Sequence, residues 1–342
     1  MSTKLIFSCL RNEGPFLLEW ISYHLSFGFD HFLLFTNDCE DGTDAIADRL
    51  TELGIATHIR NTPGKRGPQW TALNSAPLAA ALQKAELAIH LDADEFINAP
   101  DLGHLEAGMG DADALSLPWR FFGSAGHIRF ADQQVRAQFT RCGAYPVNFP
   151  RQALMFKTLF RPSDRLNRAG VHGPRPNRGE GMGNLTWLNG DGRPVSRLFS
   201  PNAPVLYGPD AGNGLGQINH YALKSRESFL VKSARGLPNH GHVPVDLSYW
   251  ARRNFNDIED RRLADTAIPD LRDQDPVLAD LHDRAVTWHQ GKIKDVLATP
   301  QGVELFSALA VVGNTVVPDD PEIRMLYAAL GHVFGKDRAT GG

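Results

Sequence analysis

Residues 89–96 join an apolar run of strand length to two aspartates one residue apart, and this segment constrains the fold most. A strand that is hydrophobic on both faces is typical of the centre of a parallel sheet, whose ligands bind at the carboxyl ends of the strands. Because side chains alternate along a strand, Asp92 and Asp94 share a face and can converge on one hard cation. The spacing therefore predicts Mg²⁺ or Mn²⁺ bridging a diphosphate. The alternative is a turn in which Asp92 caps a helix and Asp94 faces solvent.

Strand and helix patterns alternate through the first third of the chain. Strands are predicted at 5–9, 32–35, 55–59 and 87–91, and helices at 15–27, 41–53 and 69–84. This order is typical of an α/β fold with a mostly parallel, Rossmann-like central sheet and right-handed crossovers. The fourth predicted strand carries Asp92 at its carboxyl end.

The rest of the chain is less regular. One more strand is predicted at 114–119, and the density of Pro, Gly and Asn between 161 and 216 predicts loops. Five helices are predicted after that, at 226–235, 247–262, 276–297, 301–310 and 321–334, with a frayed tail at 335–342. The sequence shows no repeat and no low-complexity linker.

Composition narrows the class of protein. The 342 residues are 42% hydrophobic and 22% charged, which suffices for a sizeable core. A formal net charge of -4 provides no basic field for nucleic acid. The three cysteines, Cys9, Cys39 and Cys142, are too scattered for a disulfide framework or a zinc cluster, and they favour a reducing cytoplasm. No segment approaches the roughly 20 apolar residues of a membrane span, so membrane contact is expected only as peripheral attachment at the inner face.

Several short motifs occur in an order that resembles a known family. The sequence reads Arg-Asn-Glu-Gly at 11–14, Leu-Glu-Trp at 18–20, Asn-Asp-Cys-Glu-Asp-Gly-Thr at 37–43 and Asp-Ala-Asp-Glu-Phe at 92–96. It resembles the family 2-like glycosyltransferases. Phe-Gly-Ser at 122–124 and His-Tyr-Ala-Leu-Lys-Ser at 220–225 are also similar to the galactan-synthase-like glycosyltransferase family 92.

The resemblance implies a GT-A fold in three parts. These are a nucleotide-sugar-binding half at 1–115, an acceptor-side half at 116–236, and a helical extension at 237–342. It also implies that Asn12, Glu13, Asn37 and Asp38 lie near the base or ribose of the donor. Glu13 equally suits the negative charge preferred at a helix start. The family pattern has an acid where this chain has Thr36, which leaves the nucleotide base open.

Basic and polar residues further along are candidates for the donor phosphates. Lys65, Arg66 and Gln69 follow a glycine and precede a helix, so they are candidates for meeting a phosphate or base together with the backbone amides of the helix entrance; a solvated loop is the alternative. The chain lacks a P-loop motif. Lys232 and Arg235 share a helix face and, with Lys224, are predicted to stabilise a leaving diphosphate. Interaction of Lys232 and Arg235 with the helix dipole is the other interpretation.

The resemblance further implies that His220 completes the metal site, although a lone histidine is more often structural. In the acceptor half, Arg141 and Lys157 are candidates for contacting a phosphate or an acidic sugar, and His172 for an acceptor contact or a base. The general base of an inverting enzyme must reach the acceptor hydroxyl. His172, Glu95 and Glu180 are its candidates.

The sequence therefore predicts a metal-dependent glycosyltransferase, with inversion expected from the family. The resemblance implies that the donor is a nucleotide-diphosphate sugar, with a UDP-sugar favoured, and that the acceptor is a glycan or lipid-linked molecule, as in polysaccharide biosynthesis. Two other classes remain open. A metal-dependent phosphohydrolase would need further acids near the metal, and a non-catalytic carbohydrate-binding protein would show no metal dependence.

Overall fold

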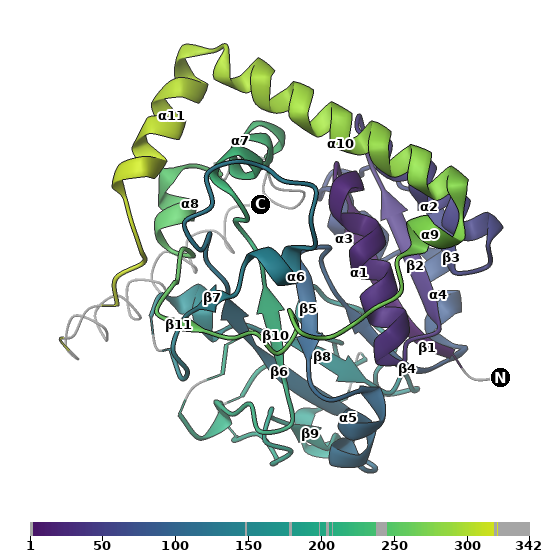
Figure 1. Ribbon diagram of the computed structural model, residues 1–342. Coiled ribbons are helices and arrows are strands. Elements are labelled where there is room, and N and C mark those ends of the chain that lie inside the picture. The colour runs from purple at the N-terminus through teal and green to yellow at the C-terminus, as the bar shows by residue number, and fades with distance from the viewer. Residues whose placement is uncertain are drawn as a thin grey trace.

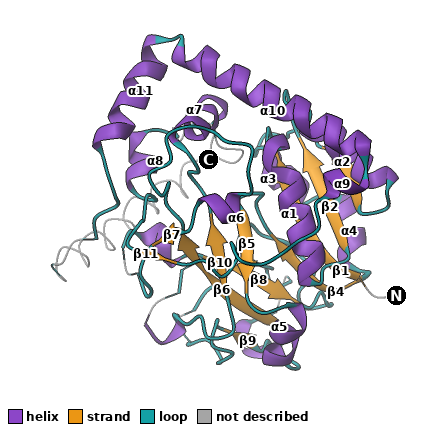
Figure 2. Ribbon diagram, in the orientation of Figure 1, coloured by secondary structure: helices purple, strands orange, loops and turns teal. Residues whose placement is uncertain are grey.

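The computed structural model describes residues 3–147, 149–177, 180–197, 199–202, 205–206, 208–236, 245–317 and 320. A central sheet lies between helical layers (Figures 1 and 2). Its strands are β1 (Thr3–Leu10), β2 (His31–Thr36), β3 (Ala56–Arg60), β4 (Ala85–His90), β5 (Glu95–Asn98), β6 (Ala114–Phe121), β8 (Phe156–Phe160), β9 (Trp187–Leu188) and β10 (Gln217–His220). The strand order is β3-β2-β1-β4-β8-β6-β10-β5, and β9 pairs with β6.

Most strand pairs of this sheet are parallel. β3, β2, β1 and β4 run parallel, as do β6 and β10. β8 is antiparallel to both β4 and β6, so β4 and β6 point the same way. β5 turns back beside β10. The α/β class with a mostly parallel sheet is confirmed, and the carboxyl ends of β1, β4, β6 and β10 share one edge of the sheet.

Eleven helices are present in the described residues. They are α1 (Gly14–Phe27), α2 (Thr43–Glu52), α3 (Pro68–Leu73), α4 (Ala76–Leu82), α5 (Leu102–Met109), α6 (Val135–Gln138), α7 (Arg226–Arg235), α8 (Leu247–Ala251), α9 (Leu271–Gln274), α10 (Pro276–Leu297) and α11 (Pro300–Val311). Short 3₁₀ turns occur at Arg151–Leu154, Met182–Asn184 and Gly208–Asp210. A two-stranded ribbon joins β7 (Arg141–Cys142) to β11 (Ile258–Glu259). The long helix α10 lies across α1, α2 and α7 (Figure 1).

The predicted helix at 69–84 is wrong as a single helix. The chain forms α3 and α4, with a break at Asn74 and Ser75. The Ser75 side chain accepts a hydrogen bond from the Leu78 N–H, and Pro77 occupies the first turn of α4. Proline fits a first turn but disrupts a helix interior. The local sequence therefore starts a second helix.

The predicted helix at 247–262 is also wrong, because α8 ends at Ala251. Beyond it, the side chain of Asn254 accepts a hydrogen bond from the Ser124 N–H and donates one to the Gly313 carbonyl. The Asn256 side chain accepts from the Ala125 N–H. Asparagine side chains that bond backbone groups compete with helical structure. These hydrogen bonds connect residues 254–256 to the loop after β6.

The middle of the chain forms loops, and its last residues lie outside the described ranges. Residues 161–216 hold only two-residue β9 and short 3₁₀ turns among their described residues, as predicted. The predicted helix at 321–334 and the tail at 335–342 lie outside the described residues. The division into three parts stays a prediction, although β1 to β5 contribute to the same sheet as β6, β8, β9 and β10. No described helix has the length and apolar character needed to cross a bilayer.

Candidate functional site

A cavity of about 620 Å³ opens at the carboxyl edge of the sheet. Eight of the residues predicted from sequence line it: Glu13, Gln69, Asp92, Asp94, His172, His220, Lys232 and Arg235. They come from the ends of β1, β4 and β10, from α3 and α7, and from the loop at 170–175. Strand register places Phe7 of β1 beside His90 of β4, so the segments that follow these strands emerge side by side.

Asp92 forms an ion pair with a buried lysine. Lys157, the second residue of β8, is fully buried and places its Nζ 3.1 Å from Asp92 Oδ2 and 3.0 Å from Glu95 Oε2. Glu95 Oε2 also accepts the Asp92 N–H at 2.9 Å. Burial raises the pKa of Asp92, but Lys157 and His90 outweigh burial and hold it below its usual value. Asp92 is therefore a fixed carboxylate.

Asp94 has its own cation. Lys232 Nζ of α7 lies 2.8 Å from Asp94 Oδ2, and His220 Nε2 lies 3.4 Å from Asp94 Oδ1. Burial opposes ionisation, yet Lys232 and then His220 hold the pKa of Asp94 well below its usual range. The His220 ring packs against Trp119, with 4.5 Å between ring centroids. β10 and α7 thus fix Asp94 between two basic groups.

The predicted metal ligands, Asp92, Asp94 and His220, make contacts that bear on metal binding. The described residues contain no group of three His, Cys, Asp or Glu side chains placed to hold one metal ion. Asp92 and Asp94 are each engaged by a lysine, and His220 Nδ1 is buried without a hydrogen-bond partner. A histidine that ligates a metal normally donates its other nitrogen to an acceptor. The residues therefore do not fit the three-ligand site, and metal dependence stays a prediction.

Five basic residues line the cavity, and their partners differ. Lys232 pairs with Asp94, and Arg235 of α7 pairs with Glu13. Arg11, Arg175 and Arg253 have no carboxylate within 4.0 Å among the described residues. In addition, the Nε atoms of Arg11, Arg235 and Arg253 are buried without hydrogen-bond partners in that part of the chain. Unsatisfied buried donors cost about 1–3 kcal/mol each, so this wall suits an anion.

Arg253 follows α8, and an aromatic ring holds it in place. Its guanidinium carbon lies 3.7 Å from the centroid of the Tyr249 ring, and its Nη1 donates to the Tyr249 carbonyl at 3.3 Å. Burial lowers the pKa of Arg253. A guanidinium stacked by its face keeps its edge free for two parallel hydrogen bonds to phosphate. Sequence reasoning missed Arg253 as a site residue, because an isolated arginine carries no motif. It also missed Arg11, although Arg11 belongs to the Arg-Asn-Glu-Gly motif at 11–14.

Four other predicted residues lie in the walls behind the cavity surface. Lys157 and Glu95 form the buried support of Asp92. Asn12 accepts the Glu40 N–H with its side chain. Lys224 lies over the Phe16 ring, 4.2 Å from its centroid, and 4.0 Å from Glu13. Burial lowers the pKa of Lys224, which faces a separate small pocket of about 20 Å³.

The structure leaves the other candidates away from the cavity lining. Asn37 donates to Asp38 at 3.4 Å in the turn after β2. Lys65 is exposed in the turn closed by Gly64 and Gly67. Arg141 of β7 donates to the Asn256 carbonyl at 2.9 Å. Glu180 accepts from the Asn184 side chain at 3.3 Å.

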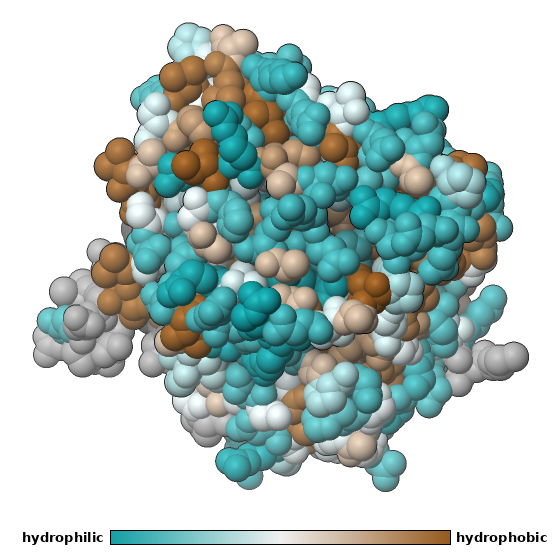
Figure 3. All heavy atoms as spheres, in the orientation of Figure 1, coloured by the Kyte–Doolittle hydropathy of each residue, from teal (hydrophilic) through white to brown (hydrophobic). Residues whose placement is uncertain are grey.

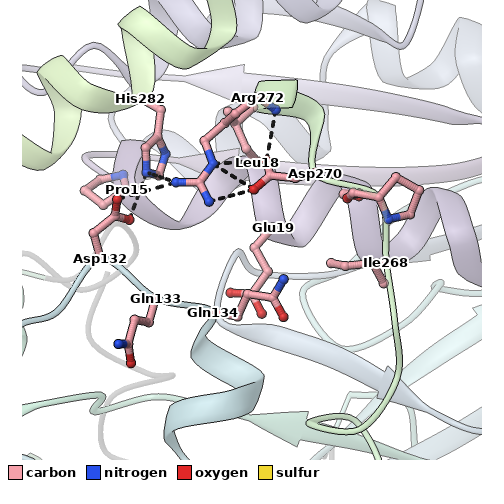
Figure 4. Close-up of a pocket in the computed structure, with 12 residues that line it drawn as sticks. Pro15, Leu18, Glu19, Asp132, Gln133, Gln134, Ile268, Asp270, Arg272 and His282 are labelled. Atoms are coloured by element: carbon pink, nitrogen blue, oxygen red, sulfur yellow. Dashed lines mark hydrogen bonds and ion pairs between the residues drawn. The ribbon is translucent and has the colours of Figure 1, made fainter. Parts of the chain in front are cut away.

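A second hollow, shown in Figure 4, lies between α1, α9 and α10 but is small, at about 30 Å³. Its charged groups are already paired: Arg272 with Asp270 and Asp132, and His282 with Asp132. The face in Figure 3 is largely hydrophilic, and brown residues gather near the turn between α10 and α11. The large cavity remains the candidate site.

Comparisons with known proteins agree in part with the motifs. No protein-family model matches the chain. The chain is 28% identical over 116 residues to a glycosyltransferase family 92 protein from Ricinus communis, which confirms the resemblance drawn from the motifs. The match covers 32% of this chain and 18% of that protein. The chain therefore spans less than a fifth of the length of this curated relative.

Two solved structures are similar at a low level. The first 349 residues of S. aureus TarS in complex with UDP share 17% identity, over 46% of this chain and 47% of that chain, with a TM-score of 0.30. HddC from Yersinia pseudotuberculosis shares 10% identity, over 50% of this chain and 84% of that chain, with a TM-score of 0.28. Scores this low carry no argument about this chain.

Proposed function

We propose that the chain is a glycosyltransferase that moves a sugar from a nucleotide-diphosphate sugar to an acceptor hydroxyl, with inversion at the anomeric carbon. The observation that carries this proposal is the large cavity, where guanidiniums without carboxylate partners face the carboxyl ends of β1 and β4. A UDP-sugar is the first donor to test, and a glycan or lipid-linked molecule is the expected acceptor. The sequence similarity to a family 92 glycosyltransferase supports the same activity.

The residues would divide the work as follows. When the bond from the anomeric carbon to the diphosphate breaks, negative charge grows on the leaving oxygen and must be stabilised. Arg253, Arg11 and Lys232 are the cations placed to do this, and Arg235 orders Glu13 and the turn after β1. Asp92 and Asp94 hold fixed negative charge beside the cavity, where positive charge develops on the sugar. His172 accepts the proton of the attacking hydroxyl.

The role of Arg253 in donor binding can be tested by substitution, with its neighbour Arg252 as a matched control. Replacing Arg253 by alanine is expected to weaken UDP binding roughly 10-fold to 100-fold, because hydrogen bonds to charged groups contribute about 1.5–3 kcal/mol. Isothermal titration calorimetry measures the change. Arg252→Ala is the control, since Arg252 is exposed and donates to Ser248 of its own helix. Equal UDP affinity in the two variants would remove Arg253 from the donor site, and no UDP binding by the unmodified chain would remove the donor itself.

Metal dependence is a separate prediction and needs its own titration. If a divalent metal held by Asp94 contributes to donor binding, Asp94→Asn is expected to weaken UDP binding about tenfold or more in Mn²⁺ but not in chelator. In chelator the same change frees Lys232 from its 2.8 Å ion pair, so binding of the anion should hold or improve. Unmodified protein that binds UDP equally in Mn²⁺ and in EDTA would contradict the metal prediction.

A further inference from the structure

Two arginines share one tryptophan at the rim of the large cavity. The guanidinium carbon of Arg66 lies 3.9 Å from the centroid of the Trp70 ring, and that of Arg175 lies 4.9 Å from it. Trp70 belongs to α3 and is half-buried, while Arg175 belongs to the loop at 170–175 and lines the cavity. We call Arg66, Trp70 and Arg175 the Trp70 cluster. It joins two segments that are about a hundred residues apart in sequence.

No carboxylate among the described residues pairs with the positive charge of the Trp70 cluster. Neither guanidinium has a carboxylate within 4.0 Å or a side-chain hydrogen bond among the described residues. A third arginine, Arg168, is held close, because the Arg175 N–H donates to the Arg168 carbonyl at 2.7 Å. Burial lowers the pKa of Arg175, and Arg168 and Arg66 lower it further. Like charges gathered in this way are stabilised when an anion binds between them.

The backbone before Arg175 leaves room for its guanidinium because residue 170 has no side chain. A Cβ on Gly170 would lie 2.7 Å from the Gly173 carbonyl oxygen and 3.2 Å from Arg175 Nε. The loop can therefore fold this tightly, with the guanidinium beside it, only because residue 170 is glycine. A planar guanidinium on an indole face keeps its edge donors available for an oxyanion. The Trp70 cluster thus combines a stacking surface with free donors.

The position of the Trp70 cluster separates it from the donor-binding arginines. Arg11, Arg235 and Arg253 come from the end of β1, from α7 and from the segment after α8. Arg175 instead lies three residues after His172, on the same loop. Gln69, next to Trp70, reaches within 3.5 Å of Asp92. A group bound at the Trp70 cluster therefore enters the cavity from the side that carries His172.

We infer that the Trp70 cluster binds a phosphate or carboxylate group of the acceptor, so that the acceptor is anionic. This inference rests on the proposed transfer reaction and names its acceptor class. Arg66 and Arg175 would bind the oxyanion, and the Trp70 ring would hold the two guanidiniums in place. Binding there holds the acceptor on the His172 side of the cavity.

The test uses the full chain saturated with UDP, so that the donor-binding arginines are occupied. Glucose 6-phosphate, glucuronate and glucose are titrated in turn by calorimetry. We expect glucose 6-phosphate, glucuronate or both to bind at least tenfold more tightly than glucose, and the two anions separate a phosphate site from a carboxylate site. Arg175→Ala and Arg66→Ala should each weaken anion binding about tenfold. Arg161→Ala is the control, because its Nη2 donates to the Gly110 carbonyl instead.

Three results would overturn the inference. The first is equal or absent binding of all three compounds to protein that binds UDP. The second is unchanged anion binding in Arg175→Ala and Arg66→Ala. The third is a loss of UDP affinity in Arg175→Ala as large as the loss for the anion, which would place the Trp70 cluster in the donor site. Absence of UDP binding by the unmodified chain would instead refute the proposed function on which the inference rests.

Discussion

Lys157→Met is expected to destabilise the protein by about 3–5 kcal/mol, the usual result of removing one partner of a buried ion pair. The Lys157 side chain is fully buried, and its Nζ contacts Asp92, Glu95 and His90 within 3.1 Å. Methionine fills similar space but leaves two carboxylates beside each other without a cation. The free energy of unfolding from urea titrations measures the effect.

A double variant shows whether charge, not packing, causes this loss. Burial raises the pKa of Glu95 well above its usual value, and Lys157 opposes that rise. Adding Glu95→Gln to Lys157→Met removes the second carboxylate at nearly constant shape, so the double variant should recover part of the lost stability. Stability of Lys157→Met within about 1 kcal/mol of the unmodified protein would show that Lys157 is not the counter-ion of this cluster.

Lys157 also shows what the sequence predicted and what it did not. Its resemblance-based role was contact with the acceptor, but β8 reads Phe-Lys-Thr-Leu-Phe and every residue of it is buried. A single lysine inside a buried strand needs a charged partner, and that signal was present in the sequence. Its partners, Asp92 and Glu95, lie more than sixty residues earlier. Only the antiparallel insertion of β8 between β4 and β6 brings them together.

The first four strands were predictable for a physical reason. The apolar runs of β1, β2 and β4 are buried on both faces, which short sequence patterns report directly, whereas the edge strand β3 fully buries only Ala56. Similar reasoning selected Asp92, Asp94, Lys232 and Arg235, which line one cavity, since the two aspartates follow a strand end and the two cations share a helix face. The sequence patterns did not identify Arg175 and Arg253 as site residues. Each depends on stacking against an aromatic ring, Trp70 or Tyr249, which no spacing rule in the sequence records.

His172→Gln is expected to lower the rate of sugar transfer roughly 10²-fold to 10⁴-fold, the range for loss of a general base. Of the three candidates for the base, only His172 lines the large cavity among the described residues. Its Nδ1 lies 3.0 Å from the Phe156 carbonyl, an arrangement that places the proton on Nδ1 and leaves Nε2 free to accept one. Glutamine keeps the polar contact but cannot take up a proton.

The charge state of His172 sharpens the test. Burial lowers its pKa to about 3, so the ring is neutral at pH 7 and stays a proton acceptor down to about pH 4. The nearby Asp92 carboxylate raises the pKa of His172 and so favours the imidazolium that proton uptake would form. UDP affinity should therefore be unchanged in His172→Gln while turnover falls. His104→Gln should change neither, because His104 lies exposed on α5. If His172→Gln keeps its turnover, proton transfer belongs to another residue or to water; if it loses UDP affinity as much as turnover, His172 is a binding residue.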